Sequence, residues 1–348
     1  MNKISMIGLD IAKDVFELCV QDDMGHTQER RQLKRKDVLN WFGRRAPSRV
    51  GLEACGGAHY WAREIGKRGH EVKMIPAQYV KPFVRTNKSD AHDAQAICRV
   101  LREPDVPSVA IADILQQDIQ ALHRVRSRLV KERTTLVNQV RGLLLEHGIA
   151  LPKRIDRARH GLRGLLQSPP PEMSPLFVSI MQDHASDLHR CDEKISNYGS
   201  RIEKLVTEDP GGERVMKIPG IGPLSASALV LKVRHASAYR NGRHFAASLG
   251  LVPRHEGTGG KVFLRGMSKR GDRYLRTLLI HGARSVINHI QKKTDPFSLW
   301  VKAVIERRGK NRAVVALANK NARIAWRVIA REEEFQAQKA VHSLIMAA

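Results

Sequence analysis

The stretch ISMIGLD, residues 4–10, is a short apolar run that ends on an acid, Asp10. A second such run, RVGLEA at residues 49–54, carries Glu53 near its end. Each run has the length and composition of a buried β-strand. Around these two runs, the sequence predicts further strands at 15–20 and 72–75 and helices around 40–42 and over 60–68. This alternation predicts an α/β domain over residues 1–110, with a central sheet covered by helices.

Long charged helices are predicted for the middle of the chain, residues 111–208. Leucine recurs there every seven residues, at Leu115, Leu122, Leu129, Leu136 and Leu143. Such a heptad is typical of a coiled-coil-like helix. The other seam position is mixed, with Val125 apolar but Asp118 and Glu132 charged, so a packed helix is favoured over a free-standing zipper. The SPPP sequence at 168–171 is expected to break the helix. Two antiparallel helices in an arm, or a dimerisation element, would explain the pattern equally well.

A mainly α C-terminal domain is predicted over residues 209–334, after the DPGG sequence at 209–212. It contains IPGIG at 218–222, followed by an apolar helix, and a Gly-rich stretch, EGTGG, at 256–260. Residues 335–348 carry no recognisable pattern and are expected to fray as a tail.

The charge of the chain points to a polyanionic partner. Its 348 residues include 60 Lys and Arg against 35 Asp and Glu, a net charge of +25. No apolar run approaches the roughly 18 residues of a membrane span, and Asp10 and Lys13 interrupt any secretory segment at the start. Four scattered cysteines argue against a zinc site or disulfide framework. We therefore expect a cytoplasmic, nucleoid-associated bacterial protein that binds nucleic acid and no membrane.

Four acids are candidate metal ligands. Asp10 and Glu53 stand at predicted strand ends, and Asp90 and Asp93 lie three residues apart, on one face of a helix that starts at Ser89. Acids gathered in so basic a protein repel one another unless a cation sits among them. Oxygen ligands of this kind suit Mg²⁺, which can activate an attacking oxygen and stabilise a leaving one. Taken singly, each acid could equally be a cap or a surface ion pair.

Several sequence blocks resemble those of one enzyme family. GLDIAK at 8–13, LEACGG at 52–57 and KSDAHDA at 88–94 are similar to the three blocks of the DEDD transposases, insertion-sequence enzymes related to the Piv invertase. Blocks at 218–222, 245–253 and 259–276 match in the family order, so the resemblance covers about residues 4–330. Within the family, the chain looks closest to the branch that inserts at specific sites.

The resemblance implies an RNase H-like, RuvC-like N-terminal domain whose four acids bind Mg²⁺. It also implies a hydroxyl nucleophile in the Gly-rich block, where relatives have Ser and this chain has Thr258. Ser268 is the fallback nucleophile. Relatives further imply a noncoding guide RNA, encoded by the element, that pairs with donor and target DNA, while the protein reads RNA shape and backbone.

Several residues are candidates for nucleic-acid contact. Gly220 and Gly222 lie in a turn that fits a helix-hairpin-helix motif, whose backbone N–H groups approach a phosphate. A tight loop is the other interpretation of this turn. A dense basic stretch follows the Gly-rich block: Lys261, Arg265, Lys269, Arg270, Arg273 and Arg276. A second basic run lies on the long helix: Arg124, Arg126, Arg128, Lys131 and Arg133. A solvated basic face is the alternative for either run.

The sequence therefore predicts a transposase that acts as a dimer or tetramer on donor and target DNA with a guide RNA. Asp10, Glu53, Asp90 and Asp93 would hold Mg²⁺, and Thr258 would attack the scissile phosphate. Two alternatives stay open. A Holliday-junction-type nuclease would use the same acids to activate water without a covalent intermediate. A non-catalytic nucleic-acid-binding protein would use them only to balance charge.

Overall fold

The computed structural model of the chain describes residues 5–84, 90–234 and 238–338. The chain forms two compact units, Met1–Gln117 and Asp118–Ala348. The predicted helical middle therefore belongs mostly to the same unit as the C-terminal helices. Within the described residues, no helix is long and apolar enough to cross a membrane.

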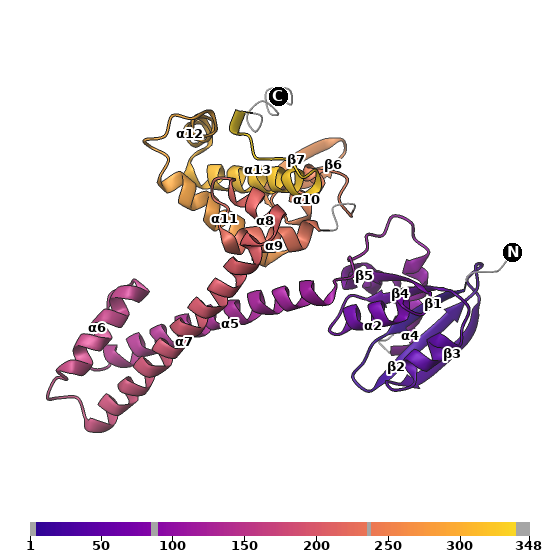
Figure 1. Cartoon of the computed structure of the whole chain (residues 1–348), viewed down its shortest axis with the longest axis horizontal. Helices are drawn as coiled ribbons and strands as arrows, with labels where there is room; N and C mark the ends of the chain where they lie inside the picture. The colour runs from indigo at the N-terminus through magenta and orange to yellow at the C-terminus, as the bar shows by residue number, and fades with distance from the viewer. Residues whose placement is uncertain (1–4, 85–89, 235–237, 339–348) are drawn as a thin grey trace. The chain divides into compact units, whose positions relative to one another are not determined.

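The first unit is built around one mixed β-sheet (Figure 1). Its elements are β1 (Met6–Asp10), β2 (Val15–Gln21), β3 (Thr27–Lys34), α1 (Val38–Gly43), β4 (Arg49–Glu53), α2 (Ala58–Gly66), β5 (Glu71–Ile75), α3 (Ala77–Val80), the 3₁₀ helix η1 (Lys81–Phe83) and α4 (Asp90–Leu101). The strand order is β3-β2-β1-β4-β5. The pairs on the β3 side are antiparallel, and those on the β5 side are parallel. The predicted α/β organisation of this region is confirmed.

The two faces of the sheet are covered by different helices. Leu9 and Leu52 are fully buried and pack in one cluster with residues of α1 and α2, among them Phe42 and Trp61. On the other face, α4 contacts β1, β2 and β4. Residues two apart on a strand share a face. In β1 and β4, one set of alternate side chains therefore faces α1 and α2, and the other set faces α4.

Strand β3 is absent from the sequence prediction. Its sequence, TQERRQLK, has Leu33 as its one buried residue. As the edge strand beside β2, it exposes most of its side chains, so it lacks the apolar alternation by which strands are recognised.

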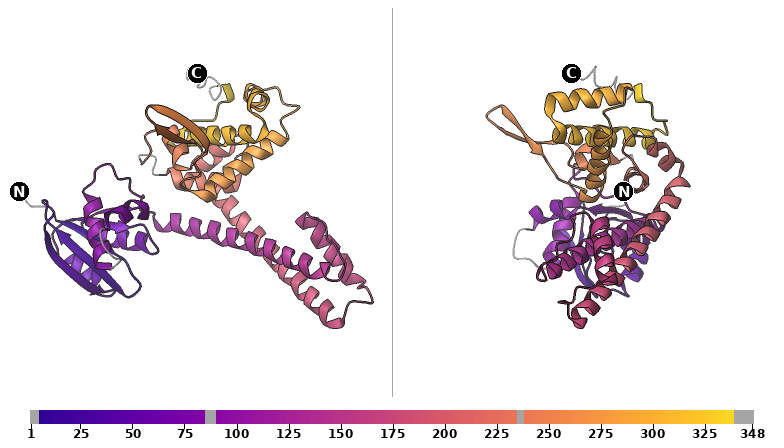
Figure 2. Two further views of the ribbon diagram at one scale, coloured as in Figure 1. Left: turned by 180° about the vertical axis from the view of Figure 1, so that it is seen from behind. Right: turned by 90° about the vertical axis from the view of Figure 1, so that its left-hand side faces the viewer.

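The helical middle folds as an antiparallel pair with a third helix packed on it (Figure 2). Its elements are α5 (Ile114–Leu145), α6 (Ile155–Gln167) and α7 (Pro175–Thr207). Leu129 of α5 packs with Cys191 and Ile195 of α7, while Val140 packs near the other end of α7 beside Met181. Of the two interpretations of the leucine pattern, the structure therefore shows the pair of antiparallel helices. The prediction was wrong for Leu115, which is 52% exposed.

The C-terminal part of the second unit is mainly helical. Its elements are α8 (Pro210–Met216), α9 (Pro223–Val233), α10 (Gly242–Ser248), β6 (Pro253–Thr258), β7 (Lys261–Met267), α11 (Arg273–Asn288), α12 (Pro296–Arg308) and α13 (Lys310–Ala330). One core unites these helices, and α13 contacts each of the helices from α8 to α12. The tail prediction was wrong at its start, because Phe335 packs against this core at 6.1 Å from the ring of Phe297. Residues 339–348 lie outside the described part.

Candidate active site and nucleic-acid surface

Two glycines bring α4 close to the strands that end in acids. Gly8 lies two residues before Asp10 in β1, and Gly51 lies two residues before Glu53 in β4. A Cβ atom at Gly8 would lie 2.1 Å from the carbonyl oxygen of Ala94 in α4, and one at Gly51 would lie 2.7 Å from a side-chain carbon of α4. Because residues two apart share a face, the carboxylates of both acids project on the face that α4 covers.

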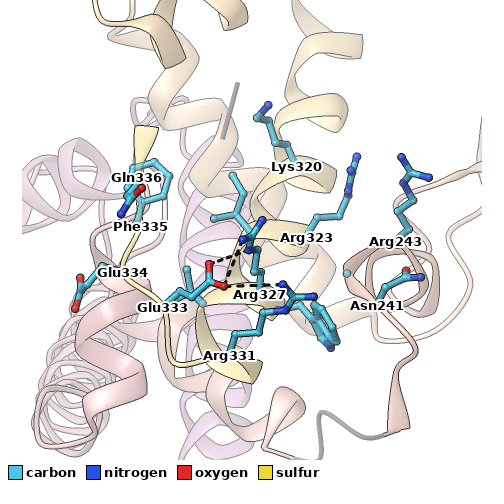
Figure 3. A pocket seen from close by; sticks show the side chains of 14 residues that line it. Asn241, Arg243, Lys320, Arg323, Arg327, Arg331, Glu333, Glu334, Phe335 and Gln336 are labelled. Atoms are coloured by element: carbon cyan, nitrogen blue, oxygen red, sulfur yellow. Dashed lines mark hydrogen bonds and ion pairs between the residues drawn. The ribbon is translucent and has the colours of Figure 1, made fainter. Parts of the chain in front are cut away.

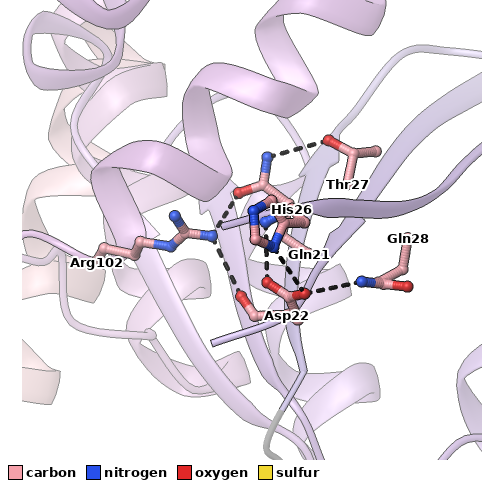
Figure 4. Close-up of polar contacts among 6 residues, drawn as sticks. All are labelled: Gln21, Asp22, His26, Thr27, Gln28 and Arg102. Atoms are coloured by element: carbon pink, nitrogen blue, oxygen red, sulfur yellow. Dashed lines mark hydrogen bonds and ion pairs between the residues drawn. The ribbon is translucent and has the colours of Figure 1, made fainter. Parts of the chain in front are cut away.

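The direction of α4 decides which end of the sheet its first turn approaches. Arg102, which follows α4, donates a hydrogen bond from Nη2 to Oε1 of Gln21 at 2.8 Å (Figure 4). Gln21 is paired with Met6 at the beginning of β1. Since α4 also crosses Gly8, it runs antiparallel to β1, and its first turn points toward Asp10.

The lengths of helix and strand agree with this placement. From Ala94, which lies over Gly8, back to Asp90 is about 6 Å of helix. From Gly8 to Asp10 is about 6.6 Å of strand. The backbone of the first turn of α4 is therefore level with Asp10. This turn also contains Asp93, which is partly exposed.

Asp10 and Glu53 end two neighbouring parallel strands at the same end of the sheet. The parallel register pairs Leu9 with Leu52, so the next residue of each strand is an acid. Cys55, which follows β4, is affected by both groups: desolvation raises the pKa of its thiol, and the negative charges of Glu53 and Asp10 raise it further. This end of the sheet therefore has a negative potential that suits a cation. Cys55 was not recognised from the sequence as a neighbour of the site.

The described side chains alone do not complete a metal centre. Within the part of the chain that the structure describes, no three His, Cys, Asp or Glu side chains form a group that could hold a metal ion. Asp90 begins α4, but its side chain falls outside the described residues. The structure thus brings together Asp10 and Glu53 and directs the first turn of α4, with Asp93, toward them.

Thr258 ends β6 at the tip of an exposed hairpin. It pairs with Lys261 across a two-residue turn of Gly259 and Gly260, whose φ angles are 55° and 77°. Positive φ at both positions favours glycine and matches the right-handed twist of a hairpin. Only a Gly-rich stretch was predicted here, and the hairpin was missed, although a Gly-Gly pair between strands is a hairpin signal. Ser268, after β7, is less exposed than Thr258.

The basic stretch after the hairpin is fixed by its backbone. Gly250 and Gly271 permit close contact between the two chain segments, since a Cβ at Gly250 would lie 2.2 Å from the carbonyl oxygen of Arg270. Five of the six predicted cations are exposed: Lys261, Arg265, Lys269, Arg270 and Arg273. The assignment of Arg276 to the nucleic-acid surface was wrong. Its guanidinium is buried and donates to the carbonyl oxygens of Leu249 and Arg270 at 2.7 and 3.1 Å.

The glycines of the PGIG turn have different environments. Gly220 has φ 88°, and a Cβ there would lie 2.8 Å from the carbonyl oxygen of Gly282 in α11. Asn321 of α13 donates to the carbonyl oxygen of Pro219 at 2.8 Å. Gly220 therefore serves close packing, as the tight-loop interpretation expects. Gly222 stands at the N-cap of α9, where backbone N–H groups of the first turn have no partner within the helix.

The basic run on α5 contains both outward-facing and inward-facing arginines. Arg124 and Arg128 are oriented away from the helix pair, and Arg128 forms an ion pair with Glu132 at 2.5 Å. Arg133 instead turns inward to Asp192 of α7, at 3.1 Å. Arg124 and Arg128 are thus exposed on the outside of the helix pair, whereas Arg133 stabilises the pair.

A buried histidine joins α5 to the helices that carry the basic surface. The ring nitrogens of His123 lie 2.9 Å from Oη of Tyr274 in α11 and 3.0 Å from Oγ of Ser227 in α9. Burial, together with the nearby Arg126 charge, lowers the pKa of His123 to about 4. The imidazole is thus neutral at neutral pH and acts as a structural link. Tyr274 follows Arg273 directly, so this link helps to position the start of α11.

Two transposase sequence families match separate parts of the chain. The DEDD transposase model that carries the name IS110 matches residues 7–149. The model described as the transposase IS116/IS110/IS902 family matches residues 212–298. The first match contains the acids at the sheet edge, and the second contains the PGIG turn, the hairpin and the basic stretch. A DEDD transposase domain implies dependence on a divalent metal.

Curated relatives match nearly the whole chain. A protein of Pseudomonas aeruginosa, named as a probable family 20 transposase, is 45% identical over 94% of this chain and 98% of its own length. The transposase for insertion sequence element IS1111A of Coxiella burnetii is 40% identical over 97% of this chain and 92% of its own. The transposase for element IS1328 of Yersinia enterocolitica is 37% identical over 94% and 97%.

Proposed function

The chain belongs to the IS116/IS110/IS902 family of transposases, enzymes that cut and rejoin DNA, and we propose that it does so with a Mg²⁺-dependent carboxylate site and a hydroxyl nucleophile. The proposed metal ligands are Asp10, Glu53, Asp90 and Asp93. The observation that carries the proposal is the shared placement of Gly8 before Asp10 and Gly51 before Glu53. This spacing seats α4 on the sheet and leaves both carboxylates on its face, toward its first turn.

Different residues would bind the metal, attack the phosphate and stabilise its charge. When bound, Mg²⁺ would stabilise negative charge on the phosphate and the leaving oxygen. Asp10 and Glu53 hold two oxygen ligands on rigid neighbouring strands. Thr258 Oγ1 forms the new bond to phosphorus, and one bond from phosphorus to a sugar oxygen breaks. Lys261 and Arg265, on the facing strand of the hairpin, would stabilise the charge that develops on the phosphate.

Further parts of the proposal concern fold and partners. The mixed sheet, antiparallel on one side of β1 and parallel on the other, supports an RNase H-like N-terminal domain. The α8–turn–α9 sequence, with Gly222 at the N-cap of α9, supports a helix-hairpin-helix-like contact with a phosphate. We propose donor and target DNA, an element-encoded guide RNA and a second copy of the chain as partners, with a dimer or tetramer as the working form.

Metal removal tests the proposed chemistry. The full chain, purified from its own host with bound nucleic acid retained, is incubated with a plasmid that carries the DNA flanking its gene. We expect broken and rejoined strands with Mg²⁺, none with EDTA, and recovery when Mg²⁺ is restored. Sequencing the retained RNA identifies a guide. Strand cutting that persists in EDTA would contradict the metal proposal. Metal-dependent cutting with no protein–DNA adduct would instead favour the junction-nuclease alternative.

The basic loop gives a separate prediction about binding. Replacing Lys269, Arg270 and Arg273 together by Ala is expected to weaken DNA binding and to reduce the slope of log K against log salt by roughly one unit for each phosphate that is no longer neutralised. The measurement is fluorescence anisotropy with labelled DNA over a salt series. The matched control removes three exposed cations elsewhere, Arg307, Arg308 and Lys310. An equal change of slope in both variants would show that the loop has no special role.

A further inference from the structure

A pocket of about 550 Å³ lies beside α13, and its lining is strongly basic (Figure 3). It is bounded by the start of α10, by α13 and by the segment 331–336. Five cations line it: Arg243, Lys320, Arg323, Arg327 and Arg331. Two carboxylates, Glu333 and Glu334, also line it. The cations therefore outnumber the acids, and none of these residues belongs to the site described above.

The cations come together because of a helical spacing and a close approach. Lys320, Arg323, Arg327 and Arg331 follow one another at intervals of three, four and four residues, which places them along one side of α13 and its C-cap residue. Gly242, the first residue of α10, brings Arg243 to this side: a Cβ at Gly242 would lie 2.8 Å from the carbonyl oxygen of Arg323.

Three of the cations are not neutralised by the protein. Within the described ranges, no ion pair or hydrogen bond joins Arg243, Lys320 or Arg323 to a carboxylate. Lys320 is 5% exposed; its Nζ has no hydrogen-bond partner and lies 4.1 Å from the ring centroid of Trp300. Burial and the charge of Arg323 lower the pKa of Lys320 to about 8, while burial and the charge of Arg243 lower that of Arg323. Like charges packed this way favour an anion.

Glu333 interacts with the other end of the same row of cations. Its carboxylate accepts from Nε of Arg327 at 2.8 Å and from Nη2 at 3.3 Å, and it lies 4.0 Å from Arg331. This paired geometry is the one in which Arg holds a planar or tetrahedral anion. Of the two carboxylates in segment 331–336, only Glu333 pairs with this row of cations, because Glu334 pairs with Lys217.

We propose that this pocket binds a phosphate of a nucleic-acid backbone, with Arg243 and Arg323 as its principal ligands and Glu333 as a competing anion at its edge. A phosphate suits the pocket because two guanidinium groups can share its oxygens, and because a charged ligand offsets the repulsion between them. That a nucleic acid supplies this phosphate rests on the proposed function. DNA and RNA backbones share this chemistry, so the test separates them.

The test measures binding to the full chain in EDTA, so that metal chemistry plays no part. Labelled single-stranded DNA and RNA of one sequence are the probes, with poly-glutamate as a non-phosphate anion. Replacing Arg243 and Arg323 by Ala is expected to raise the Kd for DNA or RNA about tenfold or more. The matched control, Arg307→Ala with Arg308→Ala, removes the same charge from an exposed helix end. Hydrogen exchange should show protection of residues 241–248 and 318–336 by the same probe.

A variant that is expected to strengthen binding completes the test. Glu333→Gln removes the competing carboxylate and is expected to lower the Kd about threefold. A change in Kd with RNA alone or with DNA alone supports the phosphate site and identifies which nucleic acid supplies the phosphate. Equal Kd values for the pocket and control variants, or protection by poly-glutamate but by neither nucleic acid, would overturn the inference. Failure of the wild type to bind either nucleic acid would contradict the proposed function as well.

Discussion

Asp10→Asn and Glu53→Gln are each expected to abolish strand cutting while leaving nucleic-acid binding within about twofold of the wild type. Each change keeps the size of the side chain and removes one charged oxygen ligand. Because a bound metal supplies several kcal/mol of charge stabilisation, the rate should fall about a thousandfold or more. The measurement is the yield of cut strands with Mg²⁺, beside anisotropy with the same DNA and calorimetric titration of Mg²⁺.

Matched controls separate this prediction from a general loss of charge. Asp23→Asn changes an exposed aspartate in the turn between β2 and β3, and Glu71→Gln changes an exposed glutamate at the start of β5. Both lie away from the strand ends that carry Asp10 and Glu53. Thermal unfolding of the site variants, measured beside these controls, separates a loss of cutting from a loss of folding. Near-wild-type cutting by Asp10→Asn or Glu53→Gln would refute the metal site.

The placement of Asp10 and Glu53 at strand ends could be predicted because the sequence encodes it locally. Gly-Leu-Asp at 8–10 and Gly-Leu-Glu at 51–53 each combine a small residue under α4, a buried leucine on the opposite face and an acid at the strand end. Strand alternation then determines which face the acid occupies. The parallel pairing of β1 with β4 joins the two motifs and could not be derived from either motif alone.

Other features depended on contacts that the sequence does not reveal. Arg276 stands in a basic run, yet it is buried because two backbone carbonyl oxygens accept its hydrogen bonds. Gly220 looks like a phosphate-binding glycine, yet it packs against Gly282 of α11, far along the chain. The basic pocket did leave a signal in the cation spacing of α13. Its completion by Arg243 depends on how α10 packs on α13, and this contact is visible only in the fold.

Replacing Thr258 is expected to remove a covalent protein–DNA adduct, with the outcome depending on the hydroxyl rather than on shape. Thr258→Val keeps the β-branched outline and deletes Oγ1, so the adduct should fall to background. Thr258→Ser keeps the oxygen, and its freer χ1 should leave the adduct in place. The adduct is measured as labelled DNA that migrates with the protein on a denaturing gel. Ser268→Ala, which changes the other candidate hydroxyl at the base of the hairpin, should retain the adduct.

The hydroxyl of Thr258 needs a group that activates it. A threonine hydroxyl is a weak nucleophile at its ordinary pKa. The carboxylate of Glu256, two residues before Thr258 and therefore on the same face of β6, forms ion pairs with Arg254 and Arg265, the latter at 2.9 Å, so it is not available as an unpaired base. If the metal bound by Asp10 and Glu53 activates the phosphate that Thr258 attacks, Asp10→Asn and EDTA should also eliminate the adduct. An adduct that survives Thr258→Val but disappears with Ser268→Ala would move the nucleophile to Ser268.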